Sequence, residues 1–196
     1  MNSREKILEA IAKNKPALQP LPEIVSDMEY DSSVLIQQFM LALHAIGATV
    51  IKVENIQTIK DDLQKAIADG MHVVNTIQTL DMINKDINIT SDAVFLESVD
   101  KAYISGTLGV SENGAIWVEE GKMKNRLLPF ICQHLILVID SDRIIANMHE
   151  AYNRIKIDLE GFGVFIAGPS KTADIEQTLV IGAHGPRSLK VYLLNK

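Results

Sequence analysis

The sequence is poor in cysteine, in aromatic residues and in clustered basic charge. Its single cysteine, Cys132, can form no internal disulfide and cannot supply the thiolates of an iron–sulfur cluster. It lies in the apolar run LLPFICQHLILVI, where we expect it to be buried. The formal net charge is −6, and no segment is rich in Lys and Arg. The sequence therefore predicts no nucleic-acid partner.

A targeting segment and a long hydrophobic run are also missing. Residues 1–15 mix charged and apolar residues at helical spacing, without the continuous apolar stretch of a signal peptide. The apolar run 127–139 is shorter than the roughly 20 residues of a membrane-spanning helix, and Gln133 and His134 interrupt it. We predict no membrane span and expect a cytoplasmic protein.

Complete cofactor motifs are absent as well. Gly163 and Gly168 have the spacing that opens a P-loop, but Pro169 follows and removes a backbone N–H. Gly161 and Gly163 begin a dinucleotide fingerprint, whose third glycine is replaced by Ile166. The histidines show no ligand spacing such as H-x-x-x-H. We predict no metal and no bound cofactor.

The composition that is present suits one well-buried domain, because 47% of the 196 residues are hydrophobic. Residues 3–14 form a short amphipathic pattern, and Pro16, Pro20 and Pro22 follow in an extended linker. We therefore divide the chain into an N-terminal helix with a proline-rich linker, residues 1–22, and an α/β domain, residues 23–196.

Helical and strand patterns alternate through this domain. Helices are predicted from Asp31 to Ile46, from Thr58 to Asp69 with Ile59, Leu63 and Ile67 inward, and from Asp142 to Ile155. Strands are predicted over residues 48–53, 72–74, 93–96, 102–104, 115–118, 134–139, 163–167 and 190–194. Helices that alternate with short apolar strands indicate an α/β sandwich with a largely parallel sheet. Ligands bind such sheets beyond the carboxyl ends of the strands, where we expect the loop that starts at Gly168.

The C-terminal half also carries a specific signature. Residues 168–194, GPSKTADIEQTLVIGAHGPRSLKVYLL, combine a GPS-basic-TADIE run with a G-x-HGPR turn, and GVSENGAIWVEE and KNRLLPFICQHLILVI precede them. Together these segments resemble the lactate-utilization protein C (LutC/YkgG) family of the LUD-domain group. The family's AETGT landmark appears here as SENGA, residues 111–115, with both threonines replaced. The resemblance covers residues 100–196.

The resemblance implies a three-layer α/β domain related to the NagB/RpiA/CoA-transferase-like folds. It also implies a role beside two partner proteins in oxidising L-lactate to pyruvate. Such an oxidation needs an electron acceptor. Because this chain has one cysteine and no dinucleotide fingerprint, we expect the redox chemistry on iron–sulfur partner subunits. This chain is then a non-redox subunit that binds a ligand or assembles the complex.

The candidate ligand is a small carboxylate or phosphate-bearing molecule. Lys171 and Arg187 supply positive charge, and an arginine can hold a carboxylate through two parallel hydrogen bonds. Ser170 and Thr172 either cap a helical turn or hold the anion; in the alternative, Ser170 only caps and Lys171 points to solvent. The predicted ligand-binding residues are Asn113, Gly114, Gly168, Ser170, Lys171, Thr172, Asp174, Glu176, Gly185 and Arg187.

Two acidic residues and a histidine complete this candidate site. Asp174 is expected to hold His184 or Arg187 in place, and the alternative is that Asp174 or Glu176 only caps a helix. His184 either acts as an acid or base or bonds a backbone carbonyl.

Glu112 supports a different hypothesis. The string SENG, residues 111–114, resembles the motif that carries the nucleophilic glutamate of class I CoA-transferases. On that alternative Glu112 attacks an acyl thioester and the chain is an enzyme. Glu112 could instead bond the backbone of the Asn113–Gly114 turn.

A third alternative for the function of the chain is a regulatory domain that senses an organic acid. A single site requires that the Glu112 turn and the Gly168 loop meet in space.

Overall fold

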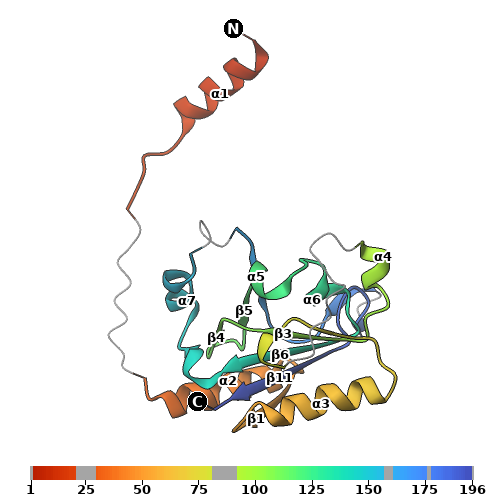
Figure 1. Ribbon diagram of the computed structural model, residues 1–196. Helices are drawn as coiled ribbons and strands as arrows, with labels where there is room; N and C mark the ends of the chain where they lie inside the picture. The colour runs from red at the N-terminus through yellow and green to blue at the C-terminus, as the bar shows by residue number, and fades with distance from the viewer. Residues whose placement is uncertain (1, 21–29, 81–91, 157–160, 176–177, 196) are drawn as a thin grey trace.

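Five parallel strands form the centre of the fold. The computed structural model describes residues 2–20, 30–80, 92–156, 161–175 and 178–195, and Figure 1 shows β1, β11, β6 and β3 side by side. In sheet order they are β1 (Thr49–Val53), β11 (Ser188–Leu194), β6 (His134–Asp140), β3 (Lys101–Ser105) and β2 (Val73–Asn75). Each neighbouring pair is parallel, which confirms the predicted largely parallel sheet.

Helix α3 (Gln57–Ala68) covers one face of this sheet. Ile59 and Leu63 recur at helical spacing and are buried, as predicted. Ile67 was also predicted to point inward, but it is 41% exposed and Ala66 is buried instead. The helix ends at Ala68, and Gly70 follows with φ of +79°, a conformation that favours glycine.

The other face packs against a second sheet and helix α2 (Ser32–Ala45). The second sheet has the order β7 (Ile144–Ile145), β4 (Leu108–Val110), β5 (Ile116–Glu119), β8 (Gly163–Ile166). Asp31 caps α2 by accepting a hydrogen bond from the Ser33 N–H at 2.7 Å. Leu35, Phe39 and Leu43 are buried in the core that both sheets share. With α3 on the outside, these layers form the predicted α/β sandwich.

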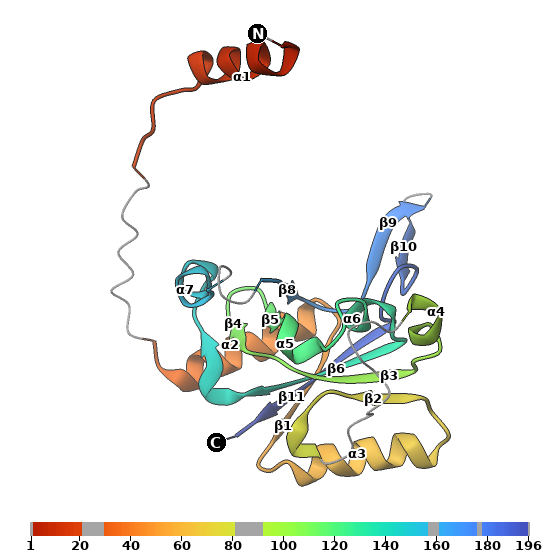
Figure 2. The ribbon, with the colours of Figure 1, turned by 45° about the horizontal axis from the view of Figure 1, so that its top comes forward.

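Shorter elements complete the domain. Helix α7 (Met148–Arg154) packs on the outer face of the second sheet through Ala151. Further short helical segments are η1 (Gln78–Leu80), α4 (Ala93–Leu96), α5 (Glu120–Met123), α6 (Leu128–Ile131) and η2 (Ser141–Arg143). Strands β9 (Lys171–Ile175) and β10 (Thr178–Ile181) form an antiparallel hairpin that projects from the sheets in Figure 2. None of the helices in the described segments has the length and apolar character needed to cross a membrane.

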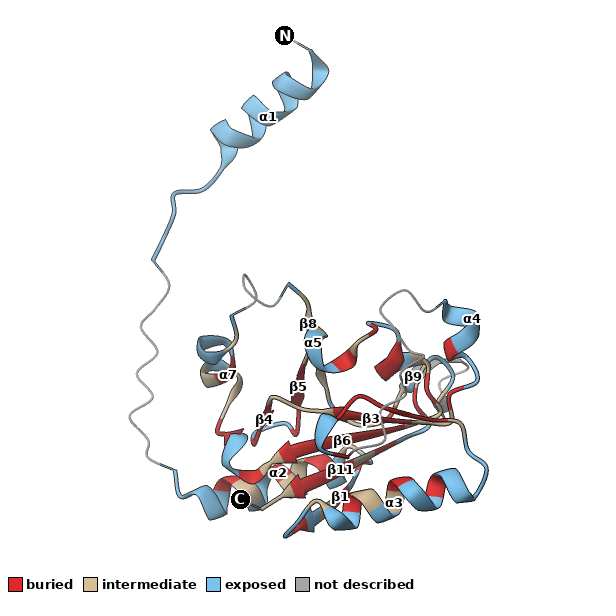
Figure 3. Cartoon of the chain, in the orientation of Figure 1, coloured by how far each residue is buried: buried red, intermediate tan, exposed pale blue. Residues whose placement is uncertain are grey.

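Helix α1 (Ser3–Asn14) forms where it was predicted, but it buries none of its residues (Figure 3). A capping box starts it: the Glu5 N–H donates to the Asn2 side chain, and the Asn2 N–H donates to the Glu5 carboxylate, both at 2.9 Å. Its apolar residues Ile7, Leu8 and Ile11 are 50–60% exposed. The predicted domain boundary between residues 22 and 23 falls outside the described residues.

Two predicted elements are wrong. Residues 93–96 form helix α4 rather than a strand; Leu96 is its buried residue and Val94 is 74% exposed, so burial does not alternate along the segment. The helix predicted from Asp142 begins later. The Ile144–Ile145 pair, which favours extended backbone, joins β4 as strand β7, and Asn147 caps α7 instead.

Strand β8 forms as predicted but does not belong to the parallel sheet. It pairs antiparallel with β5, and Trp117 lies opposite Phe165. Gly163 makes room for this packing, because a Cβ there would lie 2.1 Å from the Trp117 ring. The prediction that the Gly168 loop follows a strand of the parallel sheet is therefore wrong. An apolar run such as GVFIA is typical of buried strands in either sheet, so its partner could not be deduced from composition.

Candidate functional site

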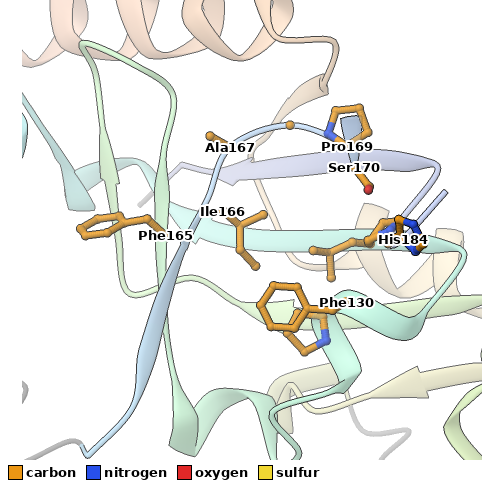
Figure 4. A pocket seen from close by; sticks show the side chains of 12 residues that line it. Phe130, Phe165, Ile166, Ala167, Pro169, Ser170 and His184 are labelled. Atoms are coloured by element: carbon orange, nitrogen blue, oxygen red, sulfur yellow. The ribbon is translucent and has the colours of Figure 1, made fainter. Parts of the chain in front are cut away.

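The loops that contain Gly168 and Gly185 lie side by side beyond β8. The Ser170 N–H donates to the Pro186 carbonyl at 2.9 Å, and the Gly182 N–H donates to the Ser170 carbonyl at 3.0 Å. A cavity of about 220 Å³ opens beside these loops (Figure 4), and we call it the loop cavity. The predicted site residues that line it are Gly168, Ser170, His184 and Gly185.

The loop cavity is mainly apolar. Phe130, Leu135 and Ile166 contribute to its walls, and Ser170 and His184 are the polar side chains among its lining residues. The loops fit closely there, because a Cβ on residue 185 would lie 3.0 Å from the Ser170 Cβ. Such a cavity suits an apolar group with few polar contacts more than it suits an anion.

Lys171 and Thr172 begin strand β9 rather than the helical turn that was predicted for this segment. Thr172 pairs with Val180 of β10. The Lys171 Nζ donates to the Ile46 carbonyl at 2.5 Å, just beyond the last residue of α2. A cation is favourable at the carboxyl end of a helix. The Lys171 ammonium therefore connects the loop to α2 and does not line the loop cavity.

Arg187 lies at the start of β11, outside the loop cavity. Its N–H donates to the Gln133 carbonyl at 2.8 Å. Because β3, β6 and β11 are parallel neighbours, Lys101, His134 and Ser188 lie in one row across their amino ends. The His134 Nδ1 is 2.8 Å from the Ser188 Oγ. A second cavity of about 220 Å³, the amino-edge pocket, is lined by Met71, Lys101, His134, Leu135, Ile136, Ser188 and Lys190.

Positive charge concentrates around His134. Burial lowers the pKa of His134, the charges of Lys101, Arg187 and Lys190 lower this pKa further, and Asp100 acts in the opposite direction. The nearby positive charges, which disfavour an imidazolium, also favour a bound anion. Our sequence reasoning missed Lys101 and Lys190, and it considered His134 only as a metal ligand. The sequence does show that Lys101, His134 and Lys190 each stand at or beside the start of a predicted strand.

Lys190 is already paired within the fold. Its Nζ lies 3.1 Å from the Asp62 Oδ1, and the buried Tyr103 donates its hydroxyl to the Asp62 Oδ2 at 2.6 Å. Burial raises the pKa of Asp62, but the hydrogen bonds from Tyr103 and Lys190 and the charges of Lys190 and Lys101 outweigh it and hold the pKa below its usual value. Within the described residues, Arg187 and Lys101 form no ion pair. Lys101 lines the amino-edge pocket, and Arg187 lies outside its lining.

The Glu112 turn supports α7 instead of the loop cavity. The Glu112 carboxylate accepts a hydrogen bond from the Met148 N–H at 3.0 Å, at the first residue of the helix. The turn closes through Asn113, whose side chain accepts from the Ala115 N–H at 2.9 Å, while Gly114 has φ of +71°. None of residues 111–114 lines the loop cavity or the amino-edge pocket. Among the described residues, the Glu112 turn and the Gly168 loop therefore do not share either of these two cavities.

Asp174 and Glu176 lie at the limit of the described residues. Asp174 belongs to β9, but its side chain is outside the described part of the structure, as is the whole of Glu176. Their expected roles beside His184 and Arg187 stay predictions.

Cys132 is buried, as predicted, and burial raises the pKa of its thiol to about 12. Over residues 2–20, 30–80, 92–156, 161–175 and 178–195, no three His, Cys, Asp or Glu side chains are grouped in a way that could hold a metal ion.

Comparison with known proteins agrees with this architecture. The family model of the LUD domain matches residues 94–194, about half of the chain. A crystal structure of a DUF162 family protein from Deinococcus radiodurans superposes with a TM-score of 0.63 at 17% sequence identity, covering 85% of this chain and 99% of that one. This likeness shows the fold.

Curated relatives match between about half and three quarters of the chain. An uncharacterized protein of Neisseria meningitidis serogroup B is 31% identical over half of this chain. The lactate utilization protein C of Shouchella clausii is 31% identical over 46% of this chain, and that of Oceanobacillus iheyensis is 25% identical over 73%. The chain spans 43%, 42% and 65% of the length of these three relatives.

Proposed function

Since the chain belongs to the LUD domain family, we propose that it acts in lactate utilization as a non-redox subunit whose amino-edge pocket binds the carboxylate of a small organic acid. The names of the relatives from Shouchella clausii and Oceanobacillus iheyensis support the lactate-utilization role. Lys101, His134 and Ser188 carry the ligand proposal, because they lie in one row across the amino ends of three parallel strands and line the pocket.

The side chains of the pocket suit a carboxylate. Lys101 lines the pocket and supplies a positive charge. Arg187 lies outside the lining, next to Ser188, and an arginine can hold two carboxylate oxygens with parallel N–H groups. The Ser188 hydroxyl, beside His134 in the same row, can donate or accept a hydrogen bond to a hydroxyl or keto oxygen next to the carboxylate. Lactate and pyruvate both place such an oxygen there.

The redox step belongs on partner subunits in this proposal. An iron–sulfur cluster needs several cysteine thiolates, and the one cysteine of this chain is buried as a thiol. The chain therefore binds or positions the organic acid, or assembles the complex, while iron–sulfur partners carry the electrons. Assembly predicts that the chain copurifies with these partners.

Titration of His134 by NMR, with and without L-lactate or pyruvate, tests the ligand role. A bound carboxylate stabilises the imidazolium, so it should raise the pKa of His134. Arg187→Ala should weaken binding by about tenfold or more, because it removes a charge-assisted pair. Arg187→Lys keeps the charge but not the two parallel donors. Its affinity for the acid should therefore lie between that of the unmodified chain and that of Arg187→Ala.

Arg154→Ala is the matched control, because Arg154 is exposed on α7 and pairs with Glu150. It should leave binding unchanged. The ligand role is wrong if neither acid changes the titration of His134, or if the change persists in Arg187→Ala. Copurification with the partner subunits would then still test the assembly role.

A further inference from the structure

We propose that the cleft beyond the carboxyl ends of the parallel strands is a second binding site, independent of the amino-edge pocket, and that Lys122 and Lys124 hold a phosphate group there. Two cavities form this cleft, of about 360 and 310 Å³, and they are continuous because both are lined by Ile77, Thr79, Ser105 and Lys122. Cavities of this size are typical of small-molecule sites. We call it the carboxyl-edge cleft.

The position of the cleft follows from the topology of the sheet. Ser105 ends β3, Asp140 ends β6 and Leu194 belongs to the end of β11, and all three line the cleft. Ligands of parallel α/β sheets bind outside the carboxyl ends of the strands. The Gly168 loop, which we expected at this edge, follows a strand of the other sheet, so the rule points to this cleft instead.

Lys122, Lys124 and the carboxylate of Asp140 are the charged groups that line the cleft. Glu120 lies on the same short helix, but its carboxylate is held by Arg126 through hydrogen bonds of 2.6 and 3.0 Å. In the described part of the chain, neither Lys122 nor Lys124 forms an ion pair. Lysine ammonium groups suit a phosphate, which carries up to two negative charges.

Lys124 is held in a conformation that lysine rarely adopts. Its φ is +60° and its ψ is −34°, and it is the non-glycine residue with positive φ among the described residues. Buried neighbours impose this conformation: Met123 is fully buried, and the Asn125 side chain accepts a hydrogen bond from the Leu127 N–H at 2.9 Å. Strain of this kind is characteristic of binding sites, where the position of a side chain matters.

Hydroxyl groups supply further donors for phosphate oxygens. Thr79 and Ser105 line both parts of the cleft. The Thr76 hydroxyl donates to the Lys122 carbonyl at 2.7 Å and so anchors the short helix that carries Lys122 to the rim of the cleft. The apolar side chains of Ile77 and Leu194 leave room for a carbon skeleton beside the phosphate.

Calorimetric titration of the full chain with inorganic phosphate and with glycerol 3-phosphate tests the proposal, with sulfate as a third probe. Binding of either phosphate compound should weaken about tenfold or more in Lys122→Gln and in Lys124→Gln, and should weaken as salt is added. Tighter binding of glycerol 3-phosphate than of inorganic phosphate supports a phosphorylated metabolite, and the reverse order supports free phosphate. Equal binding of sulfate and both phosphate compounds overturns the proposal.

Two variants separate binding from folding. Lys124→Gly removes the charge and relieves the positive φ, so it should weaken phosphate binding while raising the melting temperature. Lys65→Gln, on the exposed side of α3, is the matched control and should bind normally. Absence of phosphate binding by the unmodified chain, or unchanged binding in both lysine variants, overturns the proposal.

Discussion

At the scale of single residues, the function of a side chain in this protein depends on which neighbours the sheet register brings to it. Lys101, His134 and Arg187 are far apart along the chain, and they approach one another because three parallel strands start in the same row. No local pattern could have shown this cluster. By contrast, the burial of Cys132 was predictable, because a cysteine within a long apolar run is usually a core residue.

The lowered pKa of His134 leads to a prediction about acid stability. As the pH falls below the ordinary histidine value of 6.5, the unfolded chain binds a proton at this residue before the folded chain does. Stability should therefore fall as the pH drops from about 6.5 through the lower pKa of the folded state. His134→Gln, which keeps a neutral polar group beside Ser188, should remove this part of the acid sensitivity.

Urea unfolding at pH 7.5 and pH 5 measures this effect. The free energy of unfolding should fall less for His134→Gln than for the unmodified protein between the two pH values. His149→Gln, on the exposed surface of α7, is the control. If the free energy of unfolding falls equally in all three proteins, then His134 has the same pKa in the folded and unfolded states.

At the scale of elements, the helices with clear caps and periodicity were predictable, and the pairing of strands was not. α2 and α3 were predicted within a residue or two, because Asp31 caps one and apolar residues recur at helical spacing in both. β8 was found but assigned to the wrong sheet, and the Asp142 helix was extended across a strand. Both errors concern contacts with distant segments, which short apolar runs do not encode.

The contact between α2 and the Gly168 loop is an element-scale feature that can be tested by substitution. Gly168 has φ of +83°, and a Cβ there would lie 2.9 Å from the Ile46 carbonyl oxygen. Gly70 has a similar φ of +79° but no atom within 4 Å of that position. Gly70→Ala should therefore cost only the conformational strain, roughly 1–2 kcal/mol. Gly168→Ala should cost more, because the loop must also move away from α2.

Denaturant unfolding of the two variants gives the comparison directly. Both variants carry the same backbone strain at positive φ. The difference between their losses of unfolding free energy therefore measures the cost of the steric contact with the Ile46 carbonyl. Equal losses would show that the loop adapts freely to a side chain at residue 168, and the loop cavity would then not depend on this contact.

At the scale of the whole molecule, the two proposed sites lie at the two edges of one parallel sheet. Lys101 and Ser105 begin and end β3, and they line the amino-edge pocket and the carboxyl-edge cleft respectively. The same strand therefore contributes to both sites from its two ends. This arrangement lets substitutions at one edge be used as controls for the other, because the buried middle of the strand separates them.

The N-terminal helix gives the prediction that belongs to this scale. α1 buries none of its residues, and an isolated helix of 12 residues is only marginally stable in water. Deleting residues 1–20 should therefore change the free energy of unfolding by less than about 0.5 kcal/mol, which corresponds to a shift in melting temperature of at most about 2 °C. Binding to either site should be unchanged, because residues of α1 line neither. A drop of several degrees in the melting temperature, or a change of oligomeric state on deletion, would show that Ile7, Leu8 and Ile11 are buried in solution against this domain or a second copy.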